Sequence, residues 1–138
     1  MTNARKLFVT RLVHTVIWAV MASGIVALPF LAWTDHFGWA LAITVMMAGE
    51  GIALGCSRGA CPLTAIARRY TDDPSPAFDI FLPEWLAKWN KVIFGALFVA
   101  GEIAVLTQVQ GSLAIASSVA LAVGVVATAL SFAVRRRG

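Results

Sequence analysis

The sequence predicts an all-α integral membrane protein: a four-helix bundle of two antiparallel transmembrane hairpins, with both termini and one long interfacial loop in the cytoplasm. Three observations predict this fold. The composition is strongly apolar, four apolar segments each have about the length of a membrane span, and the positive charges lie in only three regions of the chain. We expect one transmembrane domain over residues 1–138, because a chain of this length has room for a single domain.

The composition excludes a soluble domain. Hydrophobic residues make up 59% of the chain and charged residues 13%, whereas soluble proteins have roughly 25% charged residues. A soluble domain this apolar would expose patches that aggregate. The net charge of +4 and the pI near 9.7 also suit a nucleic-acid-binding protein. However, the basic residues flank apolar segments and form no stripe, so we expect a lipid bilayer and no nucleic acid as the partner.

The four apolar segments are predicted to be membrane-spanning helices, because backbone groups in lipid must bond to one another. They cover approximately residues 12–33, 37–56, 89–108 and 112–134. Very short links join the first segment to the second and the third to the fourth, so each pair forms an antiparallel hairpin. The first segment is longer than the core of a signal peptide and no Ala-x-Ala site ends it, so we expect it to stay uncleaved.

The lysines and arginines predict the orientation. All eleven lie at the N-terminus, in or directly after the central loop over residues 57–88, or at the C-terminus. Four spans put these three regions on the same side of the membrane, and the positive-inside rule makes that side the cytoplasm. We therefore expect a multi-pass protein of the bacterial inner membrane with both termini inside.

The central loop is expected to lie along the membrane interface. Pro62 suits the first turn of a short helix, and a helix beginning at Pro83 is expected to continue into the third span. Tryptophan and basic side chains anchor such segments at the lipid headgroups. The expected anchors are Trp85, Trp89, Lys88, Lys91, Arg68 and Arg69. The apolar residues expected in the same layer are Phe78, Ile80, Phe81 and Leu82. The alternative is a solvated loop with incidental aromatic residues.

Glu50 and Glu102 are acidic residues inside predicted spans, where an ionisable side chain is costly and by default marks a functional or structural site. At 1.5 Å per residue they lie at different depths, so we do not expect them to touch. Both are candidates for a ligand or proton site, and the alternative is interhelical hydrogen bonding. His14 is a third candidate, because it lies at the cytoplasmic start of the first helix, at a depth where it could meet Glu50 or the cysteine turn.

Cys56 and Cys61 are the two cysteines of the chain, and they are candidates for metal or redox chemistry. Their spacing is compatible with zinc, but a closed zinc site needs four ligands, and Glu50 points to another face of the helix than Cys56. A disulfide is disfavoured in the cytoplasm. The alternative is that both cysteines are small packing residues. The sequence does not identify a cofactor.

Gly51 and Gly55 form a small-xxx-small pattern that permits close helix packing, either within the bundle or against a second protein. No nucleophile–base pair, phosphate-binding loop or pair of catalytic carboxylates is visible in the sequence. We therefore expect no catalytic residues and no enzyme.

The run Cys61-Pro-Leu-Thr64, soon after the membrane-embedded Glu50, resembles a family of small bacterial inner-membrane proteins of uncharacterised function. That family has four spans and a Cys-Pro-Leu-Thr motif after the second span. The segment Phe78-Asp-Ile-Phe-Leu-Pro83 is similar to its aromatic, proline-ended loop. The resemblance covers about residues 40–100 and implies the topology, not an activity.

Three functions are compatible with these features. The first is a non-catalytic accessory or scaffold subunit that packs into a larger membrane complex or a homo-oligomer. The second is a metal-, lipid- or quinone-binding membrane protein that uses the turn formed by Glu50, Cys56 and Cys61. The third is a proton or small-cation conductor that uses Glu50 and Glu102. The accessory role is the leading hypothesis.

Overall fold

The computed structural model describes residues 2–57 and 61–137, and in these ranges it contains five α-helices and no strand. The helices are α1 (Asn3–Trp33), α2 (Phe37–Cys56), α3 (Pro62–Arg68), α4 (Glu84–Gln108) and α5 (Ser112–Arg137). Among the described residues, α1, α2 and α4 are long and apolar enough to cross a membrane. The stretch Ser112–Ala127 of α5 is a shorter apolar helix. The all-α membrane class is thus supported.

The second helix has the bounds that the sequence predicts, and the first begins earlier than its predicted span. The third long helix begins next to Pro83 and runs on into the third predicted span, as the sequence predicts. The helix α1 begins at Asn3 because the Thr2 hydroxyl accepts a hydrogen bond from the Arg5 N–H at 3.4 Å and caps the helix. The predicted first span begins at residue 12, where the apolar run starts, which is about one third of the way along α1. The helix α4 begins at Glu84, directly after Pro83, and continues into the apolar stretch without a break.

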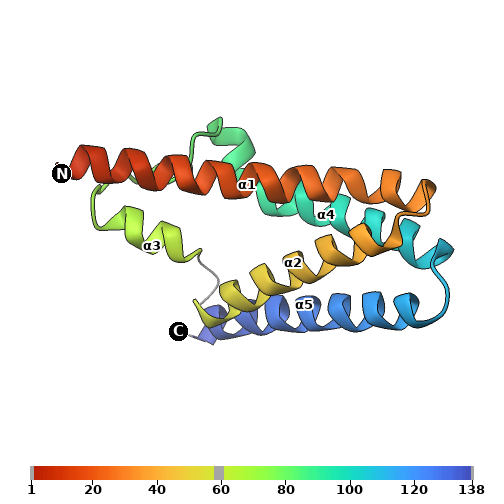
Figure 1. The fold of residues 1–138 in the computed structure, drawn as a ribbon. Helices are drawn as coiled ribbons and strands as arrows, with labels where there is room; N and C mark the ends of the chain where they lie inside the picture. The colour runs from red at the N-terminus through yellow and green to blue at the C-terminus, as the bar shows by residue number, and fades with distance from the viewer. Residues whose placement is uncertain (1, 58–60, 138) are drawn as a thin grey trace.

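Most helix–helix contacts join a helix of one predicted hairpin to a helix of the other. The most extensive contacts join α2 to α5 and α1 to α4, whereas α4 and α5 barely touch. Figure 1 shows α1 and α2 meeting at the 34–36 link and separating toward their other ends, where α3 lies between them. The short links keep the hairpin connectivity, and two residues there have positive φ angles, Asp35 at 59° and Gly111 at 69°.

The buried core lies near the links, where the long helices converge. It contains Leu28, Ala32, Ala40, Val105 and Val109. Two glycines let helix backbones approach closely: a Cβ on Gly101 would lie 2.8 Å from the Leu28 Cβ, and one on Gly124 would lie 3.1 Å from the Ala48 Cα. The α1–α4 pair and the α2–α5 pair therefore converge at the links and separate toward the end that holds α3, whereas α2 and α5 stay in contact as far as Gly55.

Candidate functional site

The loop before α4 is packed onto the first half of α1. Residues 77–80 of this loop are buried, and the Arg11 guanidinium donates hydrogen bonds to the carbonyl groups of Ala77 at 3.2 Å and Ile80 at 3.4 Å. The Phe81 N–H donates to the Thr15 hydroxyl at 2.9 Å. The side chains of Phe78 and Ile80 are therefore covered by protein and not by lipid, whereas the position of this loop at the depth of the membrane interface stays a prediction.

A cluster of four side chains, which we call the His14 cluster, connects α1, α3 and this loop. It contains His14, Cys61, Thr64 and Asp79. The His14 Nδ1 lies 3.2 Å from the Asp79 carbonyl oxygen and 3.3 Å from the Asp79 Oδ2. The Thr64 hydroxyl donates a hydrogen bond to the same carboxylate oxygen. Cys61 lies close enough to His14 for the two side chains to affect each other's protonation. The cluster holds α3 against α1.

The surroundings of Cys61 favour its thiolate form. Burial raises the pKa of the Cys61 thiol, but interactions with His14 and with the backbone of Leu63 and Thr64 together outweigh burial, and the pKa lies below its ordinary value. The thiolate is the nucleophilic form of cysteine. Cys61 therefore combines a neighbouring base with partial exposure, since its side chain is only half-buried.

Glu50 belongs to the same end of the molecule. It lies on α2 and is partly buried, and both His14 and Lys91 act electrostatically on its carboxyl group. The structure thus places His14 beside the cysteine turn, and Glu50 lies within electrostatic range of it.

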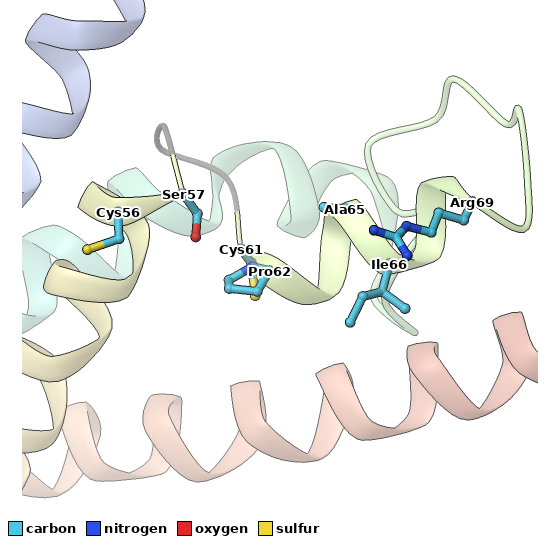
Figure 2. A pocket seen from close by; sticks show the side chains of 7 residues that line it. All are labelled: Cys56, Ser57, Cys61, Pro62, Ala65, Ile66 and Arg69. Atoms are coloured by element: carbon cyan, nitrogen blue, oxygen red, sulfur yellow. The ribbon is translucent and has the colours of Figure 1, made fainter.

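An open hollow of about 430 Å³ lies along α3, next to the His14 cluster. Its lining residues are Cys56, Ser57, Cys61, Pro62, Ala65, Ile66 and Arg69. Figure 2 shows Arg69 and Ile66 toward one end of the hollow and Cys56 at the other, with Cys61 between them. The hollow therefore offers an apolar wall, one cation and two thiols.

The cysteines are free thiols in this structure. Their sulfur atoms point in different directions, with that of Cys61 directed toward α1 (Figure 2). Within residues 2–57 and 61–137, no group of three or more His, Cys, Asp or Glu side chains is arranged to hold a metal ion. The geometry therefore favours thiol chemistry at Cys61 over metal ligation by the pair.

Glu102 is not part of this cluster and lies on α4, buried against α2. It is 1% exposed, and its Oε1 lies 2.6 Å from the Thr44 hydroxyl, which also lies 3.0 Å from the Ala40 carbonyl oxygen. A hydroxyl has one proton to donate, so both contacts are hydrogen bonds at once only when the carboxyl group carries a proton. In the described part of the chain Glu102 Oε2 has no hydrogen-bond partner. The contact joins α4 to α2.

The expected membrane anchors have different surroundings. Trp85, Trp89 and Lys88 are exposed near the start of α4, and Arg69 lines the hollow. Arg68 instead stacks on the Phe78 ring at 3.7 Å and donates to the Asp73 carbonyl oxygen at 2.7 Å, so it holds the loop. Anchoring of any of these side chains in lipid stays a prediction.

The glycine pattern of α2 is used inside the bundle. Gly51 is buried, and a Cβ on Gly55 would lie 3.2 Å from the Ala127 carbonyl oxygen on α5. This face of α2 is therefore covered by α5 at Gly55. Of the two alternatives that the sequence left open for the glycine pattern, this contact supports packing within the bundle.

Sequence reasoning missed Asp79 and Thr64. The signal for Asp79 was present, because it is the one charged residue in the otherwise apolar run from Ala77 to Leu82. Thr64 belongs to the Cys-Pro-Leu-Thr motif, but nothing in the sequence indicated a chemical role for its hydroxyl group. Without Asp79, the relation between Cys61 and His14 could not be recognised as a possible nucleophile–base pair.

Comparisons with known proteins give no match. No protein-family model matches the chain, no curated protein is similar to it, and no solved structure resembles it. The geometry of the chain itself is therefore what points to its function.

Proposed function

We propose that the chain is a multi-pass protein of the bacterial inner membrane that binds an anionic amphiphile, a molecule of the lipid class, in the hollow beside α3. In this proposal the four long helices span the membrane, and both termini and α3 are cytoplasmic. Support for the orientation is the charge distribution, since the links at 34–36 and 109–111 contain no lysine or arginine.

The composition of the hollow supports a lipid-like ligand. Pro62, Ala65 and Ile66 form an apolar wall, and Arg69 is the cation of the lining. Apolar contacts suit an acyl or prenyl chain, whereas a guanidinium forms strong paired hydrogen bonds with phosphate or carboxylate. Because α3 is placed at the end where the two helix pairs separate, such a ligand could enter from the membrane surface.

The single observation that carries the proposal is the position of α3. The His14 cluster fastens this helix to α1 by contacts with residues far apart in the sequence, and the hollow is formed along the fastened helix. Thr64 of α3 contacts Asp79, and Asp79 in turn contacts His14 of α1, so α3 is fixed in place by more than its chain connections.

Native mass spectrometry of the protein, extracted gently from its own membranes, tests the proposal. We expect a bound anionic lipid mass that Arg69→Gln weakens about tenfold, as expected for the loss of one charge-assisted hydrogen bond. Lys88→Gln is the matched control, because it removes an exposed cation that does not line the hollow. Equal lipid retention in both variants would contradict the proposal.

The other hypotheses from the sequence stay predictions. A discrete protein that co-purifies in the same experiment would favour the accessory-subunit role over ligand binding. The conductor hypothesis needs a route between Glu50 and Glu102, and Glu102 contacts Thr44, which precedes Glu50 on α2. Proton flux in proteoliposomes that is unchanged by Glu50→Gln would exclude it. Membership in the four-span family with the Cys-Pro-Leu-Thr motif is likewise a prediction.

A further inference from the structure

Cys61, His14 and Asp79 have the arrangement of a nucleophile, a base and a residue that orients the base. Asp79 contacts the Nδ1 of His14 through both its carbonyl and its carboxylate oxygen. With Nδ1 committed to Asp79, the second ring nitrogen is the one available to exchange a proton with the thiol. Nucleophilic cysteines are activated by this kind of neighbouring base.

Three contacts keep this arrangement in place. Thr64 donates to the Asp79 carboxylate from α3, the helix that Cys61 precedes. Arg11 holds the backbone on both sides of Asp79 through the carbonyl groups of Ala77 and Ile80. The charged groups that face His14 are thus Asp79 and Cys61, with Glu50 nearby on α2.

We propose that Cys61 accepts an acyl group from a fatty acyl thioester, with His14 as the base and Asp79 as a positioning residue. The inference rests on the proposed function, because the hollow beside Cys61 must hold the donor. The apolar wall of Pro62, Ala65 and Ile66 would contact the fatty chain, and Arg69 would bind the anionic carrier.

The step is a thioester exchange. The Cys61 sulfur gives its proton to His14 and attacks the carbonyl carbon of the donor, forming a new carbon–sulfur bond. The carbon–sulfur bond to the carrier breaks, and the carrier thiolate leaves with the electron pair and takes the proton back from His14. The products are S-acylated Cys61 and the free carrier thiol, so the reaction needs no oxidant.

An acyl donor fits the proposed location better than a disulfide. The cytoplasm keeps thiols reduced, so a disulfide partner for Cys61 would be scarce on that side of the membrane. The Cys56 sulfur, the other thiol of the hollow, is not directed at Cys61 (Figure 2).

The first test uses the full chain in lipid nanodiscs with palmitoyl-CoA as the donor and peptide mass spectrometry as the readout. We expect one palmitoyl group on Cys61 and none on Cys56, which lines the same hollow but lacks the His14 contact. Absence of the palmitoyl group from Cys61, or equal modification of the two cysteines, would overturn the proposal, and neither outcome depends on any variant.

The second test measures alkylation of Cys61 by iodoacetamide as a function of pH. In His14→Gln we expect the midpoint of the profile to move to higher pH and the rate near neutral pH to fall about tenfold, because less thiolate is present. Asp79→Asn should shift the profile in the same direction by less. His36→Gln, which removes the exposed histidine of the 34–36 link, is the matched control, and the circular dichroism of each sample reports that the protein is folded. An unchanged Cys61 profile in His14→Gln overturns the proposal.

These assays separate the two proposals. Iodoacetamide is small and uncharged, so its reaction with Cys61 does not require Arg69. If Arg69→Gln leaves lipid retention unchanged while the His14 dependence of alkylation holds, the proposed lipid site fails and the activated thiol stands. If lipid retention depends on Arg69 but Cys61 takes no palmitoyl group, acyl transfer fails and the lipid site stands.

Discussion

The Nδ1 atom of His14 on α1 lies 3.3 Å from the Oδ2 atom of Asp79, a residue of the loop before α4. The same carboxylate accepts a hydrogen bond from Thr64 on α3. Burial opposes ionisation of Asp79, but the hydrogen bonds with His14 and Thr64 outweigh it and hold the pKa of Asp79 below its ordinary value. One carboxylate thus joins three segments of the chain.

This contact predicts a loss of stability in acid. A carboxyl group with a lower pKa in the folded than in the unfolded chain adds stability above its unfolded pKa, near 3.9, and that stability is lost as the pH falls through the folded pKa. We expect the thermal stability in detergent to fall as the pH is lowered below about 5, and Asp79→Asn to flatten this fall. Asp72→Asn removes an exposed carboxylate of the same loop and should behave as the wild type. A fall of the same size in Asp79→Asn would show that Asp79 contributes nothing.

Glu102 is expected to contribute to stability through a neutral hydrogen bond. Glu102→Gln keeps the size of the side chain and can donate to Thr44, so the free energy of unfolding should change by less than about 1 kcal/mol. Glu102→Ala leaves a cavity and should lose about 1–3 kcal/mol. Denaturation in detergent measures both, and a double-mutant cycle with Thr44→Val should give a coupling near 0.6 kcal/mol. A larger loss in Glu102→Gln than in Glu102→Ala would contradict a hydrogen-bonding role.

The close approach of α1 and α4 predicts that Gly101 does not tolerate a side chain. A Cβ at this position would lie 2.8 Å from the Leu28 Cβ, and the resulting overpacking should cost about 1–3 kcal/mol of unfolding free energy. Gly95→Ala is the control on the same helix, because its Cβ would meet nothing within 4 Å; it should stabilise the protein by up to about 1 kcal/mol, since alanine is the better helix former. Equal effects of the two substitutions would show that these helices do not pack as described.

The proposed topology is tested by labelling single cysteines in a variant that lacks Cys56 and Cys61. An impermeant maleimide applied to intact spheroplasts should label Gln110→Cys in the outer link and should reach Asp72→Cys only after the membrane is permeabilised. Labelling of both positions in intact spheroplasts would place the central loop outside and contradict the orientation drawn from the positive charges.

The sequence predicted the helices better than their packing. The bounds of α2 and the two short links follow from where apolar runs stop, which is a local property. The pairing of α1 with α4 and of α2 with α5 is not local. In a lipid-facing chain both faces of a helix are apolar, so the hydrophobic pattern does not reveal which face packs against protein. The close contacts of Gly101 and Gly124 show which faces pack against protein, and their partners are visible only in the three-dimensional structure.

The candidate site was predicted in part. His14, Glu50 and Cys61 could be named in advance because polar or reactive side chains are rare in apolar segments. Asp79 could not be assigned, because the loop was expected to face the interface, where an acidic residue needs no partner. Its burial depends on Arg11, which lies 66 residues before Ala77 in the sequence, and no local pattern predicts such a contact.

The most direct test of the central claim, a lipid-binding site along α3, is photocrosslinking in native membranes with a diazirine-bearing phosphatidylglycerol. We predict that adducts concentrate on residues 61–69 and that Arg69→Gln, but not Lys88→Gln, removes this concentration. Adducts spread over the exposed apolar faces of α1 and α4, with the same small share on α3 in all three proteins, would contradict the claim.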